Sequence, residues 1–324
     1  MRTLFDVLQA ASQTAQQAAT QGAPGAPGPG GPPGGEHGFS YREAFLQLVQ
    51  FVGWFLSVGA VGFRFGVVRP IRGISEEAKG ILRADNAALL GVLGVVLLFV
   101  SYLGGPYLSS IAEHKSFAEA LPKNIAPFQF RMAMLVLALI GFAIVRASAG
   151  LGWTLAAIGI LIAVLLPVYT GRGAGKVNAV HVLAASTWLG TLLVLALVGI
   201  RGVIRAGPPG LSRAELVCDL VNSFSPLALT AAAVVALTGL TTAWMHLKRV
   251  SALWTTAYGV TLIVKLFFVL MVVTLGAWNW RRVGPSLGES GSEETIRRSS
   301  TMELTFAALV LLATSVLVTL PSPR

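Results

Sequence analysis

The chain has 324 residues, of which 54% are hydrophobic and 12% are charged, and its mean hydropathy is +0.73. Soluble domains carry about 25% charged residues, so this composition indicates an integral membrane protein rather than a soluble domain. The formal net charge is +10. Because the basic residues are spread thinly over the loops and form no cluster with interleaved aromatic side chains, we expect membrane lipid, and not nucleic acid, as their partner.

Eight stretches of the sequence are apolar and long enough to cross a membrane, and charged or turn-forming residues separate them. We therefore expect an all-α, polytopic membrane protein with eight transmembrane helices. The stretches are approximately 44–68, 87–103, 128–146, 151–169, 177–200, 224–247, 252–280 and 301–320.

The chain divides into three parts by composition. Residues 1–43 form an N-terminal tail whose Gly/Pro-rich segment at 22–38 is typical of a flexible linker. Residues 44–170 and 171–324 hold four stretches each, which predicts two four-helix membrane halves. Thirteen of the Lys and Arg residues lie in loops that follow odd-numbered stretches, against nine on the opposite side. Cytoplasmic loops carry the excess, so we expect both termini to face outward.

The expected topology puts all four histidines on the outward side. His37 lies in the linker, His114 in the longest outward loop, His181 about one turn into the fifth stretch and His246 at the end of the sixth. An ionisable side chain inside a spanning helix is costly to keep, so His181 is the first candidate for a functional residue. His246 is paired with it because the sixth stretch ends at the face where the fifth begins.

Imidazole and thioether groups suit copper, and a thioether selects the cuprous form. Met245 adjoins His246, so His181, His246 and Met245 are the candidate metal ligands. His114 and Met132 are candidates for capture of the ion at the outer mouth. For Met132 the alternative is core filling, which is a common role of Met.

Asn178 and Trp188 share a helical stripe with His181, and we assign both to a supporting role around it. Asn178 has two open interpretations. It either hydrogen-bonds the second ring nitrogen of His181 and fixes its tautomer, or it caps the start of the helix.

Lys265 lies about 18 Å below the outer end of the seventh stretch, by the rise of an α-helix, which is too deep for an ordinary snorkelling residue. Glu303, near the inner start of the eighth stretch, lies about 15 Å closer to the cytoplasm. We therefore expect Lys265 to interact with backbone carbonyls, water or a bound anion rather than with Glu303. Both residues are candidates for the translocation path.

A series of motifs between residues 177 and 321 resembles the copper-resistance protein D (CopD) family of bacterial inner-membrane proteins. Their order and spacing carry the resemblance, because no single motif is specific. They are Asn178 and His181 followed by Trp188-Leu189-Gly190, then Phe224-Ser225-Pro226, Thr238-Gly239, Tyr258-Gly259 with Lys265, Asn279 with Arg281, Glu303 and Pro321.

The resemblance implies an eight-span protein that moves copper across the cytoplasmic membrane, inward, beside or fused to a periplasmic copper-binding partner of the CopC type. By motif, the positions carried over are Asn178, His181, Lys265 and Glu303, whereas His246 and Met245 come from their placement. The chain departs from the family pattern in having a Gly/Pro tail where a fused copper module could stand, no Met-rich segment, and a first half that matches weakly.

Two other functions are compatible with the sequence. Two histidines on neighbouring helices at one depth can be the axial ligands of a b-type haem, so His181 and His246 could serve a haem protein. An accessory subunit of a larger membrane complex would need no ligand set. Residues 170–176 resemble a phosphate loop without its spacing, and no nucleophile elbow or pair of catalytic carboxylates is present. We therefore expect that the protein is not an enzyme.

Overall fold

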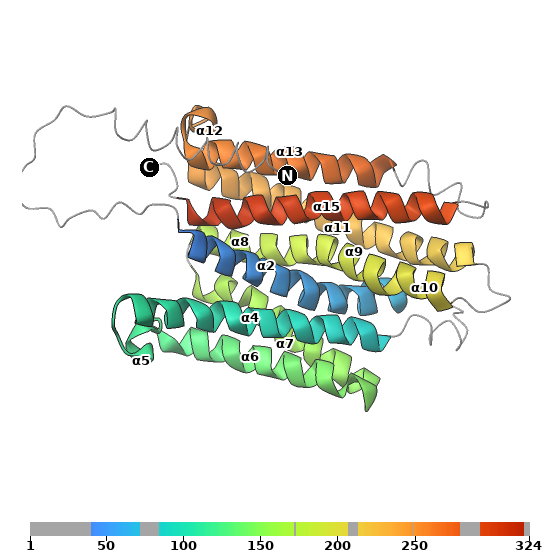
Figure 1. Cartoon of the computed structure of the whole chain (residues 1–324), viewed down its shortest axis with the longest axis horizontal. Helices are drawn as coiled ribbons and strands as arrows, with labels where there is room; N and C mark the ends of the chain where they lie inside the picture. Colours follow the sequence, from blue (N-terminus) through green and yellow to red (C-terminus); the bar gives the residue numbers. More distant parts are fainter. Residues whose placement is uncertain are drawn as a thin grey trace, which may run out of the picture.

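The computed structural model describes most of the membrane-spanning part of the chain, and the predicted tail and linker at 1–39 lie outside the described residues. Within the described part, every regular element is a helix, and the long helices lie side by side along one direction (Figure 1). The expectation of an all-α, multi-pass membrane protein is confirmed. The described ranges are 40–71, 84–171, 173–206, 213–247, 249–278 and 292–320.

The N-terminal half of the described chain forms four long helical rods. Ser40 begins the first rod as its N-cap, because its hydroxyl accepts a hydrogen bond from the backbone N–H of Glu43. The rods are α2 (Tyr41–Gly62) continued by the π-helical η1 (Phe63–Val68), α4 (Ala84–Ala112), α6 (Ile125–Ala143) continued by η2 (Ile144–Arg146), and α7 (Ala149–Thr170).

The fifth rod alternates α-helical and π-helical segments, and three further long helices follow it. π-helical turns of this kind occur frequently at functional sites. The segments of the rod are α8 (Ala174–Ala185), η3 (Ser186–Gly190), α9 (Thr191–Val194), η4 (Leu195–Ile200) and α10 (Arg201–Ala206). The later helices are α11 (Arg213–Leu247), α13 (Ala257–Trp278) after the short α12 (Ala252–Thr255), and α15 (Ser292–Thr319).

Seven helical segments of the described residues are long and apolar enough to cross a membrane. The eighth predicted stretch, 301–320, falls in α15, whose apolar part is the shorter segment Thr305–Thr319. α15 packs against α13 and lies alongside the other rods (Figure 1). Seven spans are therefore confirmed, and the eighth stays a prediction.

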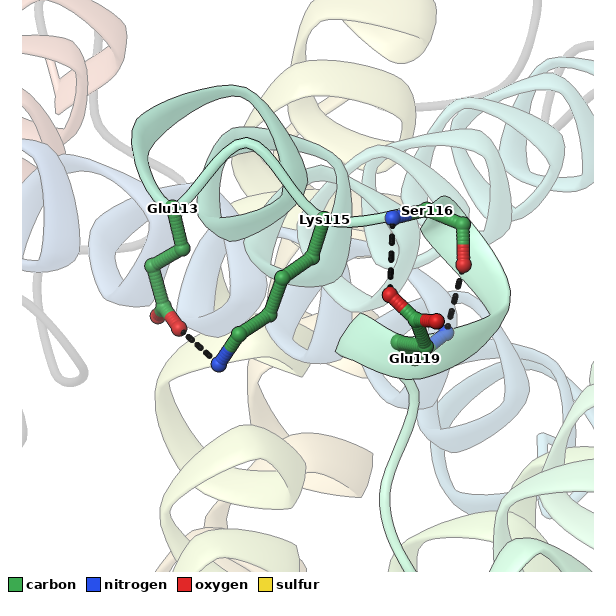
Figure 2. A network of polar contacts seen from close by, with 4 residues as sticks. All are labelled: Glu113, Lys115, Ser116 and Glu119. Atoms are coloured by element: carbon green, nitrogen blue, oxygen red, sulfur yellow. Dashed lines mark hydrogen bonds and ion pairs between the residues drawn. The ribbon is translucent and has the colours of Figure 1, made fainter.

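The outer loop predicted between the second and third stretches, 104–127, begins later than expected and contains a short helix. α4 runs through Pro106 as far as Ala112, and α5 (Phe117–Ala120) follows. Ser116 and Glu119 form a reciprocal capping box at the start of α5, as Figure 2 shows. Beside it, Lys115 donates to Glu113 over 2.6 Å, and this carboxylate raises the pKa of the exposed Lys115 ammonium.

Small residues bring α2 close to its neighbours, which puts it at the centre of the bundle. α2 contacts α4, η3, α9 and α15. A Cβ atom added at Gly59 would overlap the backbone of Gly190, and one added at Gly62 would overlap the Thr191 hydroxyl. Such close approach requires residues without a side chain at the crossing. The fifth rod thereby packs on α2 on one side and on α11 on the other.

Candidate functional site

The described histidines lie toward one end of the bundle. The short helices α5 and α12 lie at the same end of the molecule (Figure 1). α4 ends just before α5, and α11 ends just before α12. α8 also begins at this end, which places His181 two turns inside it. His114 lies two residues beyond the end of α4, and His246 lies in the last turn of α11. We call this the histidine end.

His181 of α8 is fixed by a hydrogen bond to the neighbouring helix α11. Its Nδ1 atom lies 3.0 Å from the hydroxyl oxygen of Thr238. That hydroxyl has a single proton, which it donates to the carbonyl of Val234 over 2.5 Å. The oxygen must therefore accept from His181, so the ring carries its proton on Nδ1 and leaves the lone pair on Nε2. An Nε2 lone pair is the form of imidazole that binds a metal ion.

Gly239 leaves room for the His181 ring on α11. A Cβ atom at this position would lie 3.2 Å from Cε1 of His181, which is tighter than ordinary van der Waals contact. The dipeptide Thr238-Gly239 thus provides both the hydrogen-bond acceptor and the space that the half-buried ring needs.

His246 is oriented by its own helix and by α13. Its Nδ1 atom lies 2.7 Å from the carbonyl oxygen of Thr242, one turn earlier in α11. A carbonyl oxygen can only accept, so Nδ1 carries the proton and Nε2 again has the free lone pair. The ring also lies nearly parallel to that of Tyr258, with centroids 5.8 Å apart and an interplanar angle of 12°.

Met245 lies in the last turn of α11, one residue before His246. The residue is 41% exposed on the helical bundle. A Cβ atom at Gly173, just before α8, would lie 4.0 Å from the Met245 methyl group. Met245 therefore reaches across to the start of the helix that carries His181.

The two candidate imidazoles occupy different levels. The His181 ring contacts Thr238 and the His246 ring contacts the carbonyl of Thr242, one turn further along α11, and the backbones of Thr238 and His246 are about 12 Å apart along the helix. Within the described ranges, no three His, Cys, Asp or Glu side chains gather as a group that could hold a metal ion. The candidate donors His181, Met245 and His246 are thus spread over α8 and the last turn of α11.

The supporting residues predicted from the sequence have different surroundings. Asn178 is exposed in the second turn of α8, and the Nδ1 partner of His181 is Thr238. Trp188 belongs to η3, where it is half-buried and packs against two apolar clusters of the bundle. Trp188 thus contributes to the packing directly beneath the His181 level.

Lys265 lies on α13, half-buried and within electrostatic range of the His181 ring. The rings of Phe268 and Phe306, with centroids 6.4 Å apart, set the register of α13 against α15. Lys265 precedes Phe268 by three residues, and Glu303 precedes Phe306 by three residues. Because α13 and α15 run in opposite directions, these two offsets add. Their backbones are therefore offset by about 9 Å along the bundle, which is less than the 15 Å expected from the sequence.

The two outer capture candidates lie away from α11. His114 is exposed between α4 and α5, with a φ of 51°. Met132 is on α6, which packs on α4 and α7, and its side chain contacts the main apolar core. Met132 therefore has the surroundings of a core-filling residue.

Sequence reasoning missed the residues that orient the two rings. Thr238 and Tyr258 appear in the motifs that resemble the family. A threonine or a tyrosine in a motif does not by itself predict a contact with a histidine. Thr242 acts through its backbone carbonyl, for which no side-chain signal exists. An available signal was the helical spacing of Thr238, Thr242 and His246, which places all three on one face of α11.

Comparison with known proteins connects this region to copper. The family model described as "Copper resistance protein D" matches residues 219–317. The copper transport protein CutJ of Bacillus subtilis (strain 168) is 29% identical over 143 residues, which make up 44% of this chain and 24% of the relative. The chain thus matches about a quarter of the length of that relative. No solved structure matches the chain.

The matched residues contain Thr238, His246 and Lys265, together with the position of Glu303, whereas His181 precedes them. α11, α13 and most of α15 are therefore the part of the fold with a recognised counterpart. The resemblance to the copper resistance protein D family that the sequence motifs predict is confirmed for residues 219–317.

Proposed function

We propose that this protein transports copper ions inward across the bacterial cytoplasmic membrane. Met245 and His246 receive the ion at the histidine end, and His181 takes it from them at a deeper level. The family match and the printed function of CutJ support copper as the cargo. The ligand types support it too, because imidazole and thioether bind copper while few thiolates are present to retain it.

The observation that carries this proposal is the orientation of His181. Its Nδ1 proton is used in the hydrogen bond to Thr238, so the ring is held with Nε2 available as a donor. A hydrogen bond to the ring nitrogen that does not bind the metal orients a metal-binding imidazole and raises its basicity.

The separation between levels favours transfer over tight binding. An ion that is held by few ligands at each level can leave by exchanging one donor for the next. The family match and the printed function of CutJ favour copper over a b-type haem, and haem binding is an outcome that the test can reveal.

The orientation of the protein in the membrane is part of the proposal. The histidine end faces outward, α15 is an eighth span, and both termini lie outside. A periplasmic copper-binding protein of the CopC type would deliver the ion to this end, where His114 and Met245 are exposed. Lys265 lies on the cytoplasmic side of the candidate metal ligands and within electrostatic range of His181. We assign Lys265 and Glu303 to the translocation path between His181 and the cytoplasm.

The test is copper accumulation in cells that express the full chain or its variants at equal membrane levels. His181→Ala and His181→Gln should both abolish copper-dependent accumulation, and His246→Ala should lower it. The control is Lys123→Gln, which changes an exposed residue that is not a candidate ligand. Unchanged accumulation in His181→Ala would overturn the mechanism.

Two measurements on the purified protein address the alternatives. A reduced bis-histidine haem spectrum would replace the copper proposal with the haem function. Stable co-purification with a larger membrane complex, without metal in the isolated chain, would replace it with the accessory function.

A further inference from the structure

A second polar cluster lies on the opposite side of α2 from the candidate metal ligands. It consists of Gln50 and Trp54 of α2, Tyr102 of α4 and Arg131 of α6, and we call it the Arg131 cluster. Gln50 donates a hydrogen bond from Nε2 to the Tyr102 hydroxyl over 2.9 Å. The Arg131 guanidinium carbon lies 4.9 Å from the centre of the Tyr102 ring. Three helices thus converge on one cationic side chain.

The charge of Arg131 has no carboxylate partner among the described residues. Its Nε atom is buried and makes no hydrogen bond within the described structure. Contact with the face of Tyr102 compensates part of the positive charge. The Tyr102 hydroxyl is one acceptor for the guanidinium group, but the buried Nε–H has no acceptor of its own, and a buried charged donor without an acceptor is costly. The cluster therefore lacks an anionic oxygen.

Tyr102 provides a second donor beside Arg131. Gln50 is the donor in their mutual hydrogen bond, so the phenolic proton of Tyr102 remains available. Trp54, which is almost completely buried, lies next to the same hydroxyl. The cluster is consequently rich in donors: a guanidinium fork and a phenol share one small region.

The depth of Arg131 fits a ligand at the membrane surface. Arg131 is six residues into α6, which is about 9 Å from the first residue of this helix. Side chains on an α-helix lean toward its N-terminus, which brings the guanidinium back toward the headgroup level. The residue is only half-buried as a whole, so part of it can be reached from outside.

We propose that Arg131 and Tyr102 bind a phosphate-type oxyanion at the histidine end of the bundle. Arginine matches the geometry of phosphate oxygens with two parallel N–H donors. The anion is either the phosphodiester of an outer-leaflet lipid or a free phosphate ion, since both present the same oxygens. This site is separate from the copper path and does not depend on it.

The test uses the full-length protein in detergent. Its thermal unfolding midpoint is measured with added phosphatidylglycerol, with dioleoylglycerol, which has no phosphate, and with inorganic phosphate. Wild type should be stabilised by phosphatidylglycerol and not by dioleoylglycerol. Arg131→Gln should raise the lipid concentration needed for the shift by at least about tenfold. Lys123→Gln removes an exposed charge nearby and should respond like wild type, which controls for nonspecific attraction.

The outcomes separate the two sources and the failure of the proposal. An Arg131-dependent shift with phosphatidylglycerol alone identifies a lipid headgroup, and the same shift with inorganic phosphate identifies a free anion. If Arg131→Gln does not fold, Tyr102→Phe keeps the stacking ring and should still weaken the response. Equal responses of wild type and either variant would overturn the proposal.

Discussion

The imidazole of His246 lies against the phenol ring of Tyr258, nearly parallel to it and 5.8 Å away between centroids. The contact joins the last turn of α11 to the first turn of α13, across the short helix α12. Together with the bond from Nδ1 to the Thr242 carbonyl, it restricts the His246 ring to one orientation. The proposed outer ligand is thus positioned by two helices before an ion arrives.

Replacement of Tyr258 tests this positioning role. Tyr258→Leu removes the aromatic stack, which is worth about 0.5–1.5 kcal/mol, so the initial rate of copper accumulation at low copper should fall by about two- to tenfold. Tyr258→Phe keeps the ring and should restore most of the rate. High copper should reduce the difference, because a mobile His246 binds more weakly but still binds. Equal rates for the Leu and Phe variants would contradict a role for the stack.

Thr238 gives a sharper test of the deeper ligand. Thr238→Val keeps the shape of the side chain but removes the acceptor for Nδ1 of His181. Loss of the hydrogen bond that orients a metal-binding imidazole typically lowers metal affinity by about 10–100-fold, so copper accumulation should fall by about tenfold or more. Thr238→Ser retains the hydroxyl and should rescue it. If the Val variant transports normally, the orientation of His181 by Thr238 has no functional role.

The sequence predicts the membrane-spanning helices better than it predicts their ends or their π-helical segments. Long apolar stretches identified seven membrane-spanning helices, because length and hydropathy are properties of the segment alone. Helix ends were less predictable: the second stretch was expected to end near residue 103, yet α4 continues through Pro106 to Ala112. The π-helical segments η3 and η4 have no recognisable sequence signature; η3 packs against α2, and η4 packs against α11.

One residue of the candidate site could be identified from the sequence, and its hydrogen-bond partner could not. His181 was identifiable because an ionisable residue in a spanning helix stands out against its apolar neighbours. Its partner was not, since Thr238 and Asn178 are both plausible donors or acceptors until the helices are placed side by side. The register of α8 against α11 decides between them, and register depends on contacts that no single stretch encodes.

Gly239 should be intolerant of a side chain for a reason confined to the site. In Gly239→Ala the new methyl group meets Cε1 of His181 at 3.2 Å, so the ring must shift and its bond to Thr238 weakens. Alanine favours a helix by up to about 1 kcal/mol over glycine, so the variant should be at least as stable as wild type while it accumulates several-fold less copper. Gly175→Ala, where nothing lies within 4 Å, is the matched control and should transport normally.

Gly190 should be intolerant for a different reason, which concerns the packing of α2 against the fifth rod. A methyl group at Gly190 would overlap the carbonyl oxygen of Phe55, and a backbone atom cannot move aside as a flexible side chain can. The helices would have to separate, at a cost of about 1–3 kcal/mol typical of overpacking.

The comparison for Gly190→Ala is Gly276→Ala, which has open space within 4 Å in α13. Thermal unfolding in detergent should show a lower midpoint for Gly190→Ala and an equal or higher midpoint for Gly276→Ala. Because η3 directly follows the helix that carries His181, the destabilised variant should also accumulate less copper. A Gly190→Ala protein as stable as Gly276→Ala would mean that α2 and η3 are further apart than the contact between Gly59 and Gly190 requires.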